Sequence, residues 1–113
     1  MNKKKKRIYI SGGIDHLNYE ERYKAFEEVE KRLREEGWIP FNPMKNGVPR
    51  DAPSCEHMRR DLAELNRLDH PYSAIYMMRR WTHSLGCRTE FNNATAIGLD
   101  IIFEEGAQAI KFE

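Results

Sequence analysis

Four short apolar runs divide the chain and predict the strands of a β-sheet, at residues 7–10, 38–41, 74–78 and 99–103. The run at 74–78 is apolar throughout, which is typical of a parallel strand covered on both faces. The run at 38–41 contains Pro40, which has no backbone N–H to donate, so we expect this strand at an edge of the sheet. Residues 109–112 form a possible fifth short strand.

The segments between these runs predict three helices. The first begins at a capping box formed by Asn18 and Glu21 and ends at Gly37. Ser54 is the predicted N-cap of the second helix, and an alanine-rich helical pattern follows Ser84. Apolar residues recur at helical spacing in the first two helices, at Tyr19, Tyr23, Phe26, Val29 and Leu33 and then at Met58, Leu62 and Leu65.

The alternation of strands and helices predicts an α/β fold, a three-layer sandwich in which helices cover both faces of a parallel sheet. A chain of 113 residues without an internal repeat is expected to form a single domain over residues 1–113. The sheet would then contain four or five strands.

Composition and charge exclude several classes of function. The formal net charge of +1 implies no general attraction to long nucleic acid or to a membrane surface. The basic block at residues 3–7 is interpreted as a solubilising tail, and no apolar run approaches the roughly 20 residues of a membrane span. Cys55 and Cys87 are too few for a disulfide framework and lack the spacing of a metal site, so we expect a cytoplasmic protein without a bound metal.

Candidate chemistry lies where the predicted strands end, because ligands of open α/β sheets bind at the carboxyl ends of the strands. The first strand runs into Ser11-Gly12-Gly13, where paired glycines allow a tight turn and a close approach to a ligand. The loop lacks the third glycine of the dinucleotide fingerprint, so no such cofactor is expected, and a plain turn is an equal alternative. Ser84, Gly86 and Glu90 follow the strand at 74–78.

Asp61 is the second candidate acid. It directly precedes Leu62, at the margin of the apolar stripe of the second helix. Spacing alone favours a solvated aspartate there, and a carboxyl group that faces a crevice is the alternative.

Three motifs now stand in order along the chain: Tyr9-Ile10-Ser11-Gly12, Arg60-Asp61-Leu62, and Ser84-Leu85-Gly86 with Glu90 four residues further on. Together they resemble the nucleoside 2-deoxyribosyltransferase superfamily, which includes the 2'-deoxynucleoside 5'-phosphate N-hydrolases. The chain is most similar to the small, mostly phage- and prophage-encoded proteins of that superfamily known as a domain of unknown function, DUF4406. The resemblance covers nearly the whole chain.

The resemblance implies a flavodoxin/Rossmann-like sandwich and a homodimer or higher homo-oligomer. It implies cleavage or transfer at the N-glycosidic bond of a 2'-deoxynucleoside or its 5'-monophosphate. Glu90 matches the nucleophile at the anomeric carbon, and Asp61 matches the acid beside it. Ser84 and the Ser11-Gly12-Gly13 loop match the elements that hold a 5'-phosphate or 5'-hydroxyl group, and Tyr9 matches an aromatic residue that lines the sugar and base.

This chemistry needs two carboxyl groups in different states. An ionised carboxylate stabilises or captures the oxocarbenium-like centre that forms as the bond breaks. A second carboxyl group whose pKa is raised by burial and by a like charge can stay protonated and assist the leaving base. A helix N-terminus near Ser84 would favour a bound anion and would lower the pKa of Glu90, which keeps that carboxylate ionised.

The chain departs from the superfamily at three places. Ser73 stands where an aspartate is common, residues 69–72 resemble a small insertion, and the strand-one loop offers Asp15 and His16 where the hydrolases carry an arginine. Arg88, near the Ser84 loop, is the candidate cation that could compensate. These departures keep a second hypothesis open, a non-catalytic nucleotide-binding or sequestering protein on the same fold, and a third, a structural or protein-interaction role.

Two further side chains follow the strand at 74–78. We expect Trp81 and His83 at the mouth of the pocket, where the indole of Trp81 could stack on a base. The alternative for Trp81 is a packing residue that caps this strand.

Overall fold

A computed structural model of the protein describes residues 6–14 and 17–110, and its centre is a four-stranded, all-parallel sheet. The strand order is β2-β1-β3-β4. The prediction of an α/β fold around a parallel sheet is confirmed. The strands are β1 (Arg7–Ser11), β2 (Ile39–Phe41), β3 (Ala74–Met77) and β4 (Asp100–Phe103).

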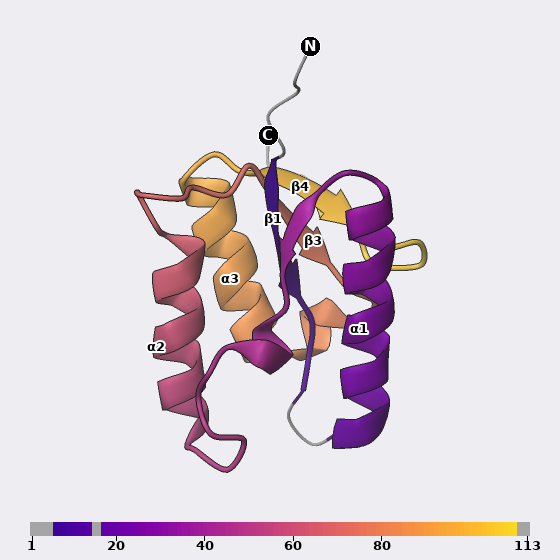
Figure 1. Ribbon diagram of the computed structural model, residues 1–113, viewed down its shortest axis with the longest axis vertical. Helices are drawn as coiled ribbons and strands as arrows, with labels where there is room; N and C mark the ends of the chain where they lie inside the picture. The colour runs from indigo at the N-terminus through magenta and orange to yellow at the C-terminus, as the bar shows by residue number, and fades with distance from the viewer. Residues whose placement is uncertain (1–5, 15–16, 111–113) are drawn as a thin grey trace.

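Helices cover both faces of the sheet, as predicted, and form a flavodoxin/Rossmann-like three-layer sandwich. Helix α1 packs on one face, and α2 and α3 lie together on the other (Figure 1). The helices are α1 (Tyr19–Glu35), α2 (Ser54–Leu65) and α3 (Leu85–Ala96), with two short 3-10 turns, η1 (Pro43–Lys45) and η2 (Trp81–His83).

The helix ends follow local chemistry. Asn18 caps α1, because its side chain accepts a hydrogen bond from the Glu21 backbone N–H at 3.0 Å, and Gly37 follows the helix with φ of 96°. The N-cap predicted for α2 was wrong. Helix α2 begins at Ser54, and its cap residue is Pro53, whose carbonyl accepts from the backbone N–H of Glu56.

Strand β1 divides the core between the two faces. Successive side chains of a strand point to opposite faces, so Ile8 and Ile10 pack with α1 while Tyr9 and Ser11 face α2 and α3. All four side chains are fully buried. The alternation therefore places two hydroxyl groups inside the α2/α3 layer at the carboxyl end of a central strand.

One edge of the sheet is as predicted, and the other is not. Pro40 lies in edge strand β2, as expected. The possible fifth strand at 109–112 is not formed by its described residues, 109 and 110, and residues 111–113 lie outside the described part of the chain. Instead, Ala107 and Ile110 pack against the core, and the Trp81 indole N–H donates to the Gln108 carbonyl at 2.8 Å. Among the helices of the described residues, none combines the length and apolarity needed to cross a membrane.

Candidate active site

Glu90 is the centre of the site. It lies on α3 and is only 5 % exposed, and each of its carboxyl oxygens accepts a hydrogen bond from a hydroxyl group of β1. The Tyr9 hydroxyl donates to Oε2 at 2.5 Å, and the Ser11 hydroxyl donates to Oε1 at 2.7 Å. Three residues that the sequence singled out are thus joined, and the strand fixes the orientation of the acid on the helix.

The environment raises the pKa of Glu90 to about 7. Burial is the largest cause, and the charge of Asp61 raises it further, whereas the hydrogen bonds from Tyr9 and Ser11 lower it. The expectation that the helix N-terminus would lower this pKa was wrong. Glu90 lies more than one turn into α3, beyond the first turn where the helix dipole is effective, and the loss of solvation outweighs it.

Asp61 is the second acid of the site. It projects from α2 and is 8 % exposed, so the solvated aspartate favoured by its spacing was wrong. Burial raises the pKa of Asp61, and the hydrogen bond from Asn46 and the charges of His57 and Arg60 oppose that rise. The charge of Asp61 in turn raises the pKa values of Glu90 and Tyr9, so the two acids interact across α2 and α3.

The glycine loop after β1 has two different roles. A Cβ on Gly12 would lie 2.6 Å from Met78 Sδ, just after β3, and 2.8 Å from Phe26 Cζ of α1, so any side chain there would have to displace these two residues. A Cβ on Gly13 would lie 3.5 Å from Ser84 Cβ. The loop therefore adjoins the residue that begins α3.

Ser84 and Gly86 lie at the start of α3. The Ser84 side chain caps the helix by accepting from the Cys87 backbone N–H at 3.2 Å. A Cβ on Gly86 would lie 3.5 Å from Met58 Sδ of α2, an ordinary van der Waals distance, so packing does not require a glycine there. The contact of Ser84 and Gly86 with a substrate stays a prediction.

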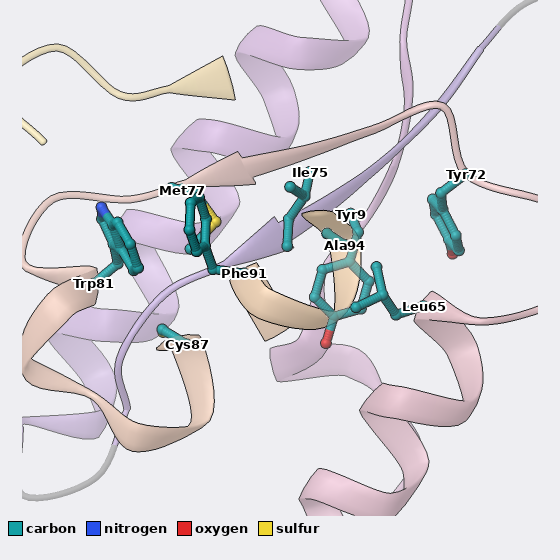
Figure 2. Close-up of a cluster of buried hydrophobic side chains, with 9 residues drawn as sticks. All are labelled: Tyr9, Leu65, Tyr72, Ile75, Met77, Trp81, Cys87, Phe91 and Ala94. Atoms are coloured by element: carbon teal, nitrogen blue, oxygen red, sulfur yellow. The ribbon is translucent and has the colours of Figure 1, made fainter. Parts of the chain in front are cut away.

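Trp81 was wrongly expected at the mouth of the pocket. It is 1 % exposed, with its ring centroid 4.6 Å from that of Phe91 and 6.2 Å from that of Phe103. Figure 2 shows Trp81 beside Met77 and Phe91 within the apolar cluster. The indole is buried, so no base can stack on it and the alternative, a packing residue, holds, whereas His83 of the same turn is exposed.

Arg88 is exposed, and its guanidinium donates to the Thr82 carbonyl at 2.8 Å, which links α3 to η2. Its expected contact with a phosphate stays a prediction. Asp15 and His16, the residues at which the loop departs from the hydrolases, lie outside the described part of the chain.

Arg22 is a cation near the site that was missed from the sequence. This partly buried side chain of α1 donates from Nε to the Gly13 carbonyl at 2.9 Å and lies over the Phe26 ring, 5.4 Å from its centroid. Its Nη2 would be 3.3 Å from a Cβ on Gly12. The i, i+4 spacing from Arg22 to Phe26 was the available signal, because it places both on the face of α1 that meets the sheet.

Asn46 and His57 were also missed. Asn46, in the loop between β2 and α2, donates from Nδ2 to Asp61 Oδ1 at 3.0 Å, and the same nitrogen is 3.2 Å from His57 Nδ1. The loop contains three prolines and a glycine, and this composition gave no indication that one of its asparagines reaches a buried acid. Within residues 6–14 and 17–110, no cluster of three or more His, Cys, Asp or Glu side chains is placed to hold a metal ion.

The comparison with protein families matches one model to most of the chain. The model is described as Domain of unknown function (DUF4406), and it covers residues 6–103, from β1 through β4. The chain belongs to the DUF4406 family. Its matched segment contains every residue of the site, from Tyr9 to Glu90. A search of the curated proteins finds no match to the chain.

Proposed function

We propose that this DUF4406 protein cleaves or transfers at the N-glycosidic bond of a 2'-deoxynucleoside or deoxynucleoside 5'-monophosphate. The observation that carries the proposal is the pair of buried acids, Glu90 and Asp61, which project from two different helices into one layer, where the charge of Asp61 raises the pKa of Glu90. Binding of a nucleotide does not require two buried acids in one site, whereas glycosidic chemistry uses such a pair. The likeness of the three motifs to the nucleoside 2-deoxyribosyltransferase superfamily supports the same reaction.

In this mechanism Glu90 is the nucleophile. Its carboxylate forms a bond to C1' of the sugar as the bond from C1' to the base nitrogen breaks, and the leaving base takes the proton of the Asp61 carboxyl group. Asp61, now ionised, accepts a proton from water as that water attacks C1' and releases Glu90. A second base in place of water gives transfer. The hydroxyl groups of Tyr9 and Ser11 orient Glu90 for the attack.

The raised pKa of Glu90 sets a pH requirement. The pKa of about 7 is raised in part by the charge of ionised Asp61, so the two acids share one proton below about pH 7 and lose it above that pH. The mechanism needs this one proton, placed on Asp61, so kcat/KM for base release should fall as the pH rises above about 7. The same property favours the second candidate function, a nucleotide-binding or sequestering protein, because a neutral Glu90 can donate a hydrogen bond to a ligand.

The 5'-monophosphate is the substrate class that Arg22 supports. Its guanidinium lies at the Gly12-Gly13 loop, beside the N-cap residue Ser84, and guanidinium groups bind phosphates through charge-assisted hydrogen bonds. We further propose a cytoplasmic homodimer or higher homo-oligomer. Leu85 at the start of α3 is 72 % exposed, and such an apolar side chain at the edge of the site suits a subunit contact.

The test is base release by the wild-type protein from a panel of deoxynucleosides and their 5'-monophosphates, beside a thermal-shift screen of the same compounds. Release of free base, or exchange of one base for another, supports the enzyme. A raised melting temperature without turnover of any compound selects the binding protein instead.

A further inference from the structure

The loop between β2 and α2, residues 42–53, is fastened to α1. Asn42 accepts at Oδ1 from the Met44 backbone N–H at 2.9 Å and donates from Nδ2 to Glu30 at 3.1 Å. Lys45 Nζ is also 3.1 Å from Glu30, and the Arg50 guanidinium lies 3.6 Å from the centroid of the Tyr19 ring. The α1 side of the loop is therefore held by hydrogen bonds, an ion pair and a cation–π contact.

On its other side the loop reaches α2 through Asn46. This side chain is 7 % exposed, and its amide both accepts and donates hydrogen bonds. The oxygen accepts from the Val48 backbone N–H at 2.9 Å, which sets the orientation of the amide and turns its nitrogen toward α2. That nitrogen donates to Asp61 Oδ1 at 3.0 Å and lies 3.2 Å from His57 Nδ1. A surface loop thus supplies a buried contact to one of the two acids.

We propose that Asn46 is the positioning residue for Asp61 and makes the loop between β2 and α2 part of the active site. The inference rests on the proposed function, in which Asp61 protonates the leaving base. Asn46 occupies Oδ1 as a hydrogen-bond acceptor, so the proton of the neutral carboxyl group belongs on Oδ2. The loop thereby selects the oxygen that delivers the proton and fixes its direction.

His57 takes part in the same contact. Asn46 Nδ2 also lies 3.2 Å from His57 Nδ1, and it can donate to that ring nitrogen only when the nitrogen carries no proton. A positive charge on His57 would favour ionised Asp61. The other charged groups that face Asp61 are Arg60 and Glu64 on α2, Glu90 on α3 and, when ionised, Tyr9 on β1.

The direct test is a pH titration of Asp61, measured by NMR on a protein labelled with ¹³C at the aspartate carboxyl carbon. Asn46→Ala removes the hydrogen bond that favours the ionised form, so its Asp61 should titrate at higher pH than in the wild type. Asn46→Asp keeps an oxygen for the Val48 N–H and replaces the donor with a like charge, so it should also move the midpoint upward. This second variant preserves the loop if the alanine variant fails to fold.

Asn42→Ser is the matched control. It lies in the same loop, keeps a side-chain oxygen for the Met44 N–H and loses the bond to Glu30, but does not touch Asp61. Its Asp61 should titrate as in the wild type. An unmoved midpoint in both Asn46 variants, or an equal shift in Asn42→Ser, would overturn the inference.

The outcome separates the inference from the proposed function. For a wild type that releases base, Asn46→Ala should lower kcat up to about 10²-fold with little change in KM, because the misdirected acid acts only in the transition state. The alkaline limb of the pH–rate profile of Asn46→Ala should move to higher pH together with the titration midpoint of Asp61. If the wild type releases no base but the Asn46 variants raise the titration midpoint of Asp61, the positioning role stands and the proposed enzymatic function is wrong. If the wild type releases base but the Asp61 midpoint is the same in the Asn46 variants, the positioning role is wrong and the enzyme proposal stands.

Discussion

Glu90 is a carboxyl group that the fold buries more readily in its neutral form than in its ionised form. Its pKa of about 7 lies above the ordinary value of 4.5, so the folded protein binds a proton that the unfolded chain has already released between these two pH values. Stability then falls as pH rises from 4.5 through 7 and is constant above that. Each unit of pKa difference corresponds to about 1.4 kcal/mol.

Glu90→Gln removes this pH dependence. Relative to the wild type, the variant should gain about 2 kcal/mol more in the free energy of unfolding at pH 8 than at pH 5. Urea denaturation at the two pH values measures the difference. Glu28→Gln, at an exposed site of α1, is the control and should give the same small change at both. A Glu90 variant whose relative stability does not change with pH would show that the burial cost is absent.

Arg22 should discriminate between ligands with and without a phosphate. Arg22→Gln removes the charge beside Gly13 and should weaken binding of a deoxynucleoside 5'-monophosphate about tenfold or more, because a hydrogen bond to a charged group contributes about 1.5–3 kcal/mol. Binding of the nucleoside itself should change little. Isothermal titration calorimetry measures both constants, with the exposed Lys31→Gln as a control. Equal losses for both ligands would contradict a phosphate contact.

At the scale of elements, Glu64 joins α2 to the start of the sheet. Its buried carboxylate accepts hydrogen bonds from Arg7 at 3.0 Å, from the Tyr72 hydroxyl and from Arg60 at 3.0 Å, with Arg67 at 3.4 Å. Burial alone would raise the pKa of Glu64, but the hydrogen bonds from Tyr72 and Arg60 and the charge of Arg67 lower it below its ordinary value. The same helix thus presents one acid held ionised and, one turn earlier, Asp61 with a raised pKa.

Glu64→Gln should therefore destabilise the protein, in contrast to Glu90→Gln. We expect a loss of about 2–3 kcal/mol at pH 7, because removal of one partner leaves buried hydrogen-bond donors of the cluster unpaired. Since the folded pKa is depressed, the loss should shrink as the pH falls through the acidic range where Glu64 becomes protonated. Thermal unfolding at pH 7 and pH 4 measures both. Unchanged stability at pH 7 would mean that the cluster contributes nothing.

The elements could be predicted from the sequence because their signals are local. The alternation of Ile8 and Ile10 with Tyr9, the capping box at Asn18 and the unbroken apolar run before Met78 each depend on neighbouring residues. Trp81 was misplaced because its indole N–H binds the Gln108 carbonyl, in a segment after β4 that directly precedes the residues predicted as a possible fifth strand. Contacts that close a core across many residues leave no local pattern.

In the site, too, the features with local signals could be predicted and those that depend on distant contacts could not. Glu90 and the Ser11 loop were found because the carboxyl ends of parallel strands mark a site and the motifs have fixed spacing. The pKa of Glu90 was predicted in the wrong direction, because it depends on how completely β1 and α2 exclude water from α3. The spacing from Arg22 to Phe26 indicated the face of α1 that meets the sheet but not the contact of Arg22 with Gly13. Asn46 reaches Asp61 from a loop whose composition gave no signal.

For the whole molecule, β1 lies inside the sheet, between β2 and β3, and turns the side chains of Tyr9 and Ser11 toward the face covered by α2 and α3. Their hydroxyl groups bind an acid of α3, and the charge of an acid of α2 raises the pKa of that acid. The arrangement lies at the centre of the fold, and the segment that forms it is the one matched by the DUF4406 model. We therefore propose that the site is a property of the fold and that the surrounding loops and Arg22 decide which nucleoside or nucleotide is accepted.

The most direct test of the central claim is base release by Glu90→Gln, measured beside its affinity for the best substrate of the wild type. Glutamine keeps the size of the side chain but removes the nucleophile, so we expect turnover to be abolished. Affinity for an anionic nucleotide should be retained or improved, because a negative charge leaves the site. Base release at the wild-type rate by Glu90→Gln would contradict the assignment of Glu90 as nucleophile and, with it, the main reason for proposing an enzyme.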